Sequence, residues 1–181
     1  LAAELVTETS EVVIATTYGM ACRFGATDVR DMGRGATGVR GIRLSGKPDD
    51  KVVGMVAISN EKEQLLVVSE NGYGKRSEVL EYRKTNRGAQ GVKTLNITEK
   101  TGKLMAINRV TEAEGLMIVT QAGITIRMNV ADTPLLGRNA QGSRLIRLRD
   151  DDAIASVALL PETVTDDETA PEEAPVQPPA E

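Results

Sequence analysis

Gly33-Arg34-Gly35-Ala36-Thr37-Gly38-Val39-Arg40 is the first of three related stretches in this chain. The other two are Asn86-Arg87-Gly88-Ala89-Gln90-Gly91-Val92-Lys93 and Gly137-Arg138-Asn139-Ala140-Gln141-Gly142-Ser143-Arg144. Their first arginines lie 53 and then 51 residues apart, and a fixed period of this size is typical of a propeller or another repeat array. We call each stretch a box.

The composition predicts a core of aliphatic layers. The 181 residues are 40% hydrophobic but include no Trp, no His, one Phe and three Tyr. Without His the chain lacks the commonest proton shuttle and metal ligand at neutral pH, and the single Cys22 provides neither a disulfide framework nor a zinc site. No apolar stretch reaches the roughly 18 to 20 residues that cross a bilayer. We expect a soluble, cytoplasmic protein with no membrane partner, and we interpret the opening at Leu1 as the start of a fragment.

The net charge of −4 conceals a basic body and an acidic tail. Residues 161–181 contain seven acids and no base, which leaves 22 bases against 19 acids before them. Such a body suits an anionic partner. The tail combines acids with five prolines and has almost nothing to bury, so we predict that residues 161–181 are disordered. It either competes with the anionic partner for the body or only keeps the chain soluble.

Aligning the chain on the boxes indicates three repeats of similar design, at about residues 11–60, 63–110 and 113–160. Each begins with an apolar, β-branched strand, at Val12–Ala15, Leu65–Val68 and Leu116–Val119. A glycine-containing hairpin turn and a second strand follow. A further apolar strand is predicted at Val52–Ser59, Leu104–Val110 and Ala153–Leu160. Four strands in about 52 residues is the size of a propeller blade.

We therefore predict an all-β fold of propeller-like blades, each of four antiparallel strands, with about three blades in residues 1–160. The boxes run into closing strands, predicted at Val39–Leu44, Val92–Ile97 and Ser143–Leu148. Leu1–Thr7 is predicted to be the last strand of another repeat. Within each second strand the alternation of side chains predicts an outward arginine, at Arg23, Arg76 and Arg127.

The boxes combine exposed backbone N–H groups with arginines, which is the chemistry that binds phosphate. A single copy is more simply a turn with a soluble surface. Three copies in register favour a polymer with regularly spaced negative charge, at roughly six to nine phosphate contacts with a salt slope on the order of −5 to −8. Reading of bases is not predicted, because neither a groove-reading helix nor repeated aromatic side chains are visible.

The second repeat resembles a known family. Asn71-Gly72-Tyr73-Gly74-Lys75-Arg76, continued by Arg87-Gly88-Ala89-Gln90-Gly91-Val92, is similar to a blade of the C-terminal domain in the A subunit of DNA gyrase, a type IIA topoisomerase. The other repeats are looser versions of it. The resemblance implies a spiral of blades, called a β-pinwheel, whose basic outer rim wraps duplex DNA so that the holoenzyme introduces negative supercoils.

The same resemblance implies which residues contact DNA. Those that match are Arg23, Arg34, Arg40, Lys75, Arg76, Arg87, Lys93, Arg127, Arg138 and Arg144, with Arg43 and Arg147 as weaker candidates. The Gln-Arg-Arg-Gly-Gly box of the family's first blade has no copy here. The catalytic tyrosine also has no match, so we predict no strand cleavage by this chain alone and no cofactor in it. ATP and Mg²⁺ would act elsewhere in the holoenzyme, which also contains the gyrase B subunit.

Two other interpretations remain. The related domain in the A subunit of topoisomerase IV has similar repeats, and a protein-interaction propeller that binds an acidic partner would share every argument from charge. A hydrolase is disfavoured because Ser, Cys and Lys residues have no obvious base beside them. The acid clusters Asp49-Asp50 and Asp150–Asp152 lack the glycine spacing of a calcium loop and are better explained as solvated turns.

Overall fold

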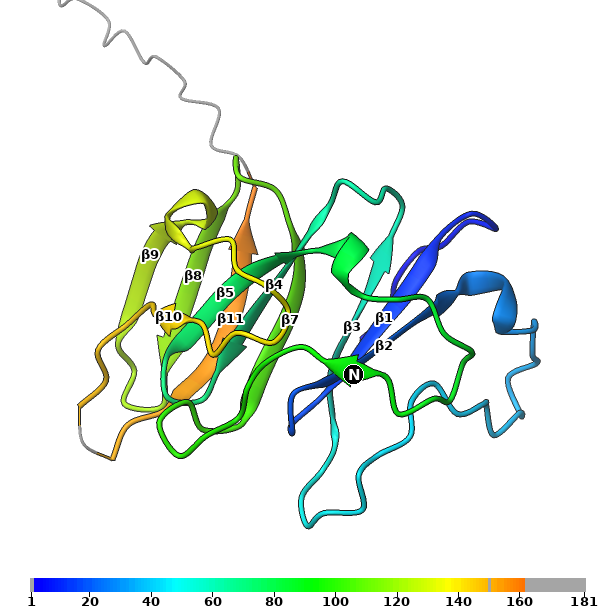
Figure 1. The fold of residues 1–181 in the computed structure, drawn as a ribbon, viewed down its shortest axis with the longest axis horizontal. Helices are drawn as coiled ribbons and strands as arrows, with labels where there is room; N and C mark the ends of the chain where they lie inside the picture. Colours follow the sequence, from blue (N-terminus) through cyan, green and yellow to red (C-terminus); the bar gives the residue numbers. More distant parts are fainter. Residues whose placement is uncertain (1, 150, 162–181) are drawn as a thin grey trace, which may run out of the picture.

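The computed structural model describes residues 2–149 and 151–161, and Figure 1 shows three twisted antiparallel sheets side by side. The first has the strand order β3-β1-β2-β6, the second β10-β5-β4-β7 and the third β11-β8-β9. The strands are β1 (Glu11–Thr16), β2 (Met20–Gly25), β3 (Val52–Ile58), β4 (Gln64–Ser69), β5 (Tyr73–Glu78), β6 (Val92–Lys93), β7 (Leu104–Val110), β8 (Gly115–Thr120), β9 (Thr125–Asn129), β10 (Ser143–Arg144) and β11 (Ile154–Leu160). The tail for which we predict disorder lies, from residue 162 on, outside the described residues.

The only helices among the described residues are three short 3₁₀ turns, one after each second strand: η1 (Ala26–Asp28), η2 (Val79–Glu81) and η3 (Val130–Asp132). None of them approaches the length or apolarity that a membrane span requires. The all-β prediction is therefore confirmed, as are the hairpins at the three glycine turns. Gly72 has a φ of 77°, which shows why a glycine is needed where β4 turns into β5.

The sheets do not coincide with the sequence repeats. Strand β6 belongs to the second box but pairs with β2 of the first repeat, with Met20 opposite Lys93. Strand β10 belongs to the third box and pairs with β5 of the second repeat, with Tyr73 opposite Arg144. Each of these boxes therefore completes the preceding sheet, and the prediction that a closing strand joins its own repeat is wrong.

The close approach of the boxes depends on glycine. Gly91 precedes β6 at a φ of 79°, and a Cβ atom there would lie 2.1 Å from the carbonyl oxygen of Ala21. Gly142 is its counterpart before β10, at a φ of 82° and 2.7 Å from the carbonyl oxygen of Gly74. Any side chain at these positions would push the box away from its sheet.

Four predicted strands are shorter or absent. Of the closing strands, only Val92–Lys93 and Ser143–Arg144 form ladders, and Val39–Leu44 forms none. Residues 2–7 are also not a strand. Val39–Leu44 and residues 2–7 find no neighbouring strand within the described part of the chain, and a strand needs a partner to satisfy its backbone groups.

The core lies between the sheets, so most sheet faces are buried. One cluster joins the first and second sheets and includes Val13, Val56, Leu65, Val67 and Leu104. Another joins the second and third sheets and includes Leu66, Val68, Leu116, Ile118 and Ile154. Successive residues of β4 therefore point into different layers, which agrees with the predicted aliphatic layers. Strand β7 packs beside β3 and β11, which leaves β6 and β10 at the opposite edges of their sheets.

Candidate nucleic-acid interface

The boxes follow one another along the outer edge of the sheets, and the second and third boxes each bond to the residues that directly follow the box before. The Arg43 N–H donates to the Ala89 carbonyl at 2.9 Å, and the Gly88 N–H donates to the Gly41 carbonyl at 2.7 Å. The corresponding contact one repeat later runs from the Asn96 N–H to the Ala140 carbonyl at 3.5 Å. We call this row of boxes, residues 33–40, 86–93 and 137–144, the box rim.

The last residue of each box is an exposed cation: Arg40, Lys93 and Arg144. The side chains of Arg40 and Lys93 have no partner among residues 2–149 and 151–161. Arg144 donates from Nη2 to the hydroxyl of Tyr73 at 2.8 Å and lies 5.5 Å from the centre of that ring. Positive side chains thus stand at equivalent places in three successive repeats, on the surface that an extended anion would meet.

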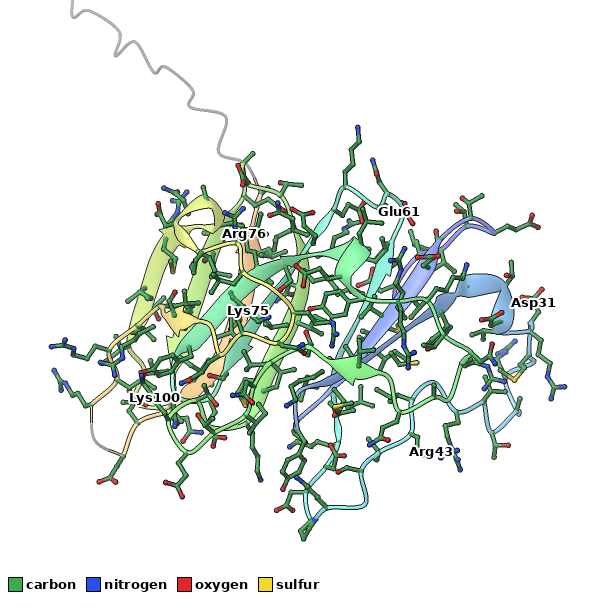
Figure 2. All side chains as sticks on the ribbon, viewed as in Figure 1. Asp31, Arg43, Glu61, Lys75, Arg76 and Lys100 are labelled. Carbon is green, nitrogen blue, oxygen red and sulfur yellow. The ribbon has the colours of Figure 1, made fainter. Side chains whose placement is uncertain are left out.

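Arg23 and Arg76, predicted to point outward, are instead buried, each 5% exposed. The prediction assumed that one face of each second strand meets solvent. Because the next blade covers that face, both arginines lie between sheets. Figure 2 shows Arg76 among the side chains of the second and third sheets.

Each of these two arginines ties its blade to the next one. Arg23 donates to the carbonyls of Val79 and Tyr82, at 3.0 and 3.1 Å, and pairs with the carboxylates of Glu11 and Glu61. Val79 begins η2 of the second repeat, and Tyr82 directly follows it. Buried guanidinium groups with charged and carbonyl partners of this kind hold structure together.

Arg76 repeats the arrangement one blade further. It donates to the carbonyl of Thr133 at 2.7 Å and to that of Ala131 at 3.3 Å, around η3. It also bonds to Gln64 and forms an ion pair with Glu112 at 2.7 Å. Neither Arg23 nor Arg76 is accessible to a phosphate in this structure.

Lys75 is completely buried, which also contradicts its predicted place on the surface. Its ammonium group donates to the carbonyls of Gly137 and Arg138, both at 2.7 Å, and to the hydroxyl of Ser77 at 3.1 Å. Burial lowers the pKa of Lys75 to about 8, with Glu81 opposing the shift and Arg138 adding to it. The amine therefore remains mostly protonated at neutral pH and anchors the third box.

The remaining predicted residues divide by exposure. Arg34 and Arg127 are exposed, Arg34 in the first box and Arg127 on β9. Arg87 and Arg138, the first cations of the second and third boxes, are half-buried, and their guanidinium groups donate to backbone carbonyls. The structure thus brings Arg40, Lys93 and Arg144 onto one rim and separates them from Arg23, Lys75 and Arg76.

The sequence reasoning missed a basic pocket beside the third box. A cavity of about 250 Å³ is lined by Tyr73, Lys100, Arg144, Arg147 and Arg149, with Asp152 on its wall. The Lys100 ammonium lies 5.4 Å from the centre of the Tyr73 ring. Figure 2 labels Lys100 at the lower left of the molecule and Arg43 at the lower right. In the sequence, the residue that could have indicated this pocket is Tyr73, which directly follows the turn glycine Gly72. An aromatic ring beside a turn can attract cations to its face.

Among the residues that the structure describes, no group of three His, Cys, Asp or Glu side chains could hold a metal ion. Each acid cluster caps backbone N–H groups instead. Asp50 accepts from the Ser45 N–H at 2.6 Å, and Asp152 accepts from the Ala122 N–H at 3.0 Å. These bonds agree with the interpretation of both clusters as turns.

Three packed sheets that exchange strands along the chain define the class of the protein, a propeller-like repeat protein with a basic rim. Comparison with family models matches residues 10–59, 63–111 and 116–161 to "DNA gyrase C-terminal domain, beta-propeller". The chain belongs to this family.

Curated relatives are DNA gyrase A subunits. The chain is 45% identical over 175 residues to the DNA gyrase A subunit of Staphylococcus aureus strain NCTC 8325, and 46% identical over 177 residues to that of strain MRSA252. These alignments cover 96% and 97% of the chain but 20% of each relative. The chain therefore spans a fifth of the length of the proteins it matches.

Two solved structures of C-terminal domains have a fold similar to that of this chain. A DNA gyrase A C-terminal domain is 29% identical with a TM-score of 0.77, over 86% of this chain and 52% of that one. The C-terminal domain of a DNA topoisomerase IV has the same TM-score at 22% identity, over 84% of this chain and 47% of that one. At that identity the second match supports the fold alone. The topoisomerase IV alternative is therefore not favoured.

Proposed function

We propose that this chain is a non-catalytic, DNA-binding part of a gyrase A subunit, and that its box rim holds duplex DNA so that the holoenzyme can introduce negative supercoils. The observation that carries the proposal is the placement of Arg40, Lys93 and Arg144, which end three successive boxes and stay exposed on one edge. A duplex offers a phosphate row of matching regularity. The partners would be duplex DNA and, in the bacterial cytoplasm, the rest of the A subunit together with the B subunit.

The rim suits the backbone of DNA better than its bases. The exposed cations stand on short edge strands and loops, and no helix of the described residues could enter a major groove. Contact with phosphates positions a duplex without reading its sequence. A row of such contacts on successive twisted blades would bend the duplex, with sequence preference arising from its deformability.

The rim is tested by removing its charges in the 181-residue chain. The variant Arg40→Gln/Lys93→Gln/Arg144→Gln should bind duplex DNA more weakly, and the slope of log K against log salt should become shallower by about 2.7, because each lost phosphate contact removes about 0.9. The matched control, Lys51→Gln/Lys62→Gln/Arg109→Gln, removes three cations outside the boxes: one next to β3, one in the turn between β3 and β4, and one on β7. It should leave the slope within about 0.9 of the wild type.

The same experiment separates the protein-interaction alternative. If the unmodified chain is not retained on duplex DNA at low salt, the proposed function is wrong. Binding of a poly-glutamate peptide through the rim under those conditions would favour an acidic protein partner. Equal slopes for the rim and control variants would show that DNA lies on another surface.

A further inference from the structure

We infer that Arg87 and Arg138, which begin the cationic part of the second and third boxes, are positioning residues that clamp each box to the one before it and do not contact phosphate. The inference rests on the proposed function for its consequence in DNA binding. The clamp itself is argued from backbone contacts and can be tested without DNA.

The first clamp joins the second box to the first. Arg87 donates from Nε to the Asp28 carbonyl at 3.1 Å and from Nη1 to the Arg40 carbonyl at 2.6 Å. Asp28 ends η1, and Arg40 ends the first box. One guanidinium group therefore holds the end of a 3₁₀ turn and the backbone of an exposed rim cation.

The second clamp repeats the first, atom for atom. Arg138 donates from Nε to the Glu81 carbonyl at 3.1 Å and from Nη1 to the Lys93 carbonyl at 2.6 Å. Glu81 ends η2 as Asp28 ends η1, and Lys93 ends the second box as Arg40 ends the first. Because the same two donors reach the same two kinds of acceptor in successive repeats, the contact is part of the design of the repeat.

The clamps act where the rim would meet DNA. Each one fixes the backbone of the residue whose side chain is free to reach outward, Arg40 or Lys93. The backbone bonds from Arg43 to Ala89 and from Asn96 to Ala140 lie beside them. The spacing between successive rim cations is therefore held by one guanidinium at each step together with these backbone bonds.

The chemistry of arginine suits this task and disfavours phosphate binding by the same group. The guanidinium presents its donors in a rigid fork, whereas a lysine ammonium is a single point of charge. In each clamp Nε and Nη1 already bond to carbonyls, which leaves Nη2 as the one guanidinium nitrogen without a carbonyl partner. At the second clamp a carboxylate oxygen of Glu81 also accepts from the backbone N–H of Arg138 at 2.5 Å. The negative charge of this carboxylate would repel a phosphate.

Arg34 provides a matched comparison. It occupies the same place in the first box as Arg87 and Arg138 in theirs, but it is exposed and has no bonded partner within the described residues. The 181 residues contain no box before that of Arg34, so in this chain Arg34 has no preceding box to clamp. Arg34 therefore serves as a control position, with the same place in the box but without the clamp.

The test replaces arginine by lysine, which keeps the charge but loses the fork. In the 181-residue chain we expect Arg87→Lys to accelerate amide hydrogen exchange at Arg43 by about tenfold or more, because the free energy needed to open the rim locally decreases. Arg138→Lys should do the same at Asn96. Arg34→Lys should leave both amides unchanged. Unchanged exchange in all three variants would overturn the clamp.

A second measurement connects the clamp to DNA. Nicked circular DNA is sealed by ligase in the presence of each variant, and the change in linking number reports the path of the bound duplex. Arg87→Lys/Arg138→Lys should reduce that change while the salt slope of binding stays that of the wild type, because no charge is lost. Arg34→Lys should alter neither quantity.

Glutamine variants distinguish the two roles by charge. Arg34→Gln should make the slope shallower by about 0.9, whereas Arg87→Gln and Arg138→Gln should leave it unchanged. Equal reductions at all three positions would overturn the inference in favour of phosphate contacts. If the unmodified chain binds no DNA, the proposed function fails, and the hydrogen-exchange result alone still decides whether the clamp exists.

Discussion

Replacing Arg76 by methionine should destabilise the chain without changing the salt dependence of its binding to DNA. Methionine keeps much of the aliphatic stem but removes the guanidinium that bonds to the Thr133 and Ala131 carbonyls and pairs with Glu112. These contacts join the second blade to η3 of the third. The variant therefore tests the connection between blades.

The magnitude follows from which partners can find water. Breaking a buried ion pair costs about 3 to 5 kcal/mol, but the Glu112 side chain is 65% exposed and is hydrated again once its partner is gone. The Thr133 residue is completely buried, and a buried group left without its bond costs about 1 to 3 kcal/mol. We expect a loss in the free energy of unfolding near the lower limit, about 3 kcal/mol.

Equilibrium urea unfolding of the 181-residue chain measures this loss, and Arg144→Met is the matched control. Arg144 is exposed, so its loss should cost less than about 1 kcal/mol. At a temperature where both variants are folded, only Arg144→Met should make the salt slope of DNA binding shallower. The reasoning would be refuted if Arg76→Met lost no more free energy of unfolding than Arg144→Met. It would also be refuted if Arg76→Met made the salt slope of DNA binding shallower by about 0.9.

Three further predictions concern stability. The pKa of Lys75 is lowered to about 8 in the folded chain, so the unfolded chain binds more protons than the folded chain between about pH 8 and 10.5. The free energy of unfolding of the wild type relative to Lys75→Met should therefore rise across that window by up to roughly 3 kcal/mol. Urea midpoints of the two proteins that keep a constant difference from pH 7 to pH 10 would contradict this. Gly91→Ala should lower the melting temperature more than Gly38→Ala, because both glycines have a positive φ but only Gly91 lies against a backbone carbonyl; calorimetry of the two variants decides. Tyr82→Phe removes a buried hydroxyl that lies 2.5 Å from the Thr94 hydroxyl and should cost about 1 to 3 kcal/mol in the free energy of unfolding, and no measurable loss would show that Thr94 finds another partner.

The hairpins were predictable because their signals are local. Apolar β-branched runs, each followed by a glycine turn, identify β1, β4 and β8 without reference to the rest of the chain. The repeat boundaries were predictable for the same reason, because equivalent residues recur at a fixed interval. The box could also be predicted to lie at the surface, since glycines and cations are unsuited to a core.

The site could be predicted only in part. Alternation correctly separates the arginine of each second strand from its apolar neighbours, but it does not say whether the other face meets solvent or another blade. Arg23 and Arg76 were therefore assigned to the surface, although both are buried. Lys75 was misplaced because a lysine is seldom fully buried, and only the carbonyls of Gly137 and Arg138, 62 and 63 residues away, make its burial possible.

By itself, the order of residues determined the all-β class, the three repeats and the box as the repeated basic element, because these depend on contacts between near neighbours and on spacing along the chain. Only the tertiary structure decided which sheet each box completes and which cations remain free. The box of one repeat pairs with the second strand of the repeat before it, and burial and carbonyl contacts between repeats then claim Arg23, Lys75, Arg76, Arg87 and Arg138. Such pairings between distant residues cannot be recognised from the spacing of residues in the sequence. An arginine that bonds to backbone carbonyls and an arginine that is free to contact a phosphate can occupy the same position of the box.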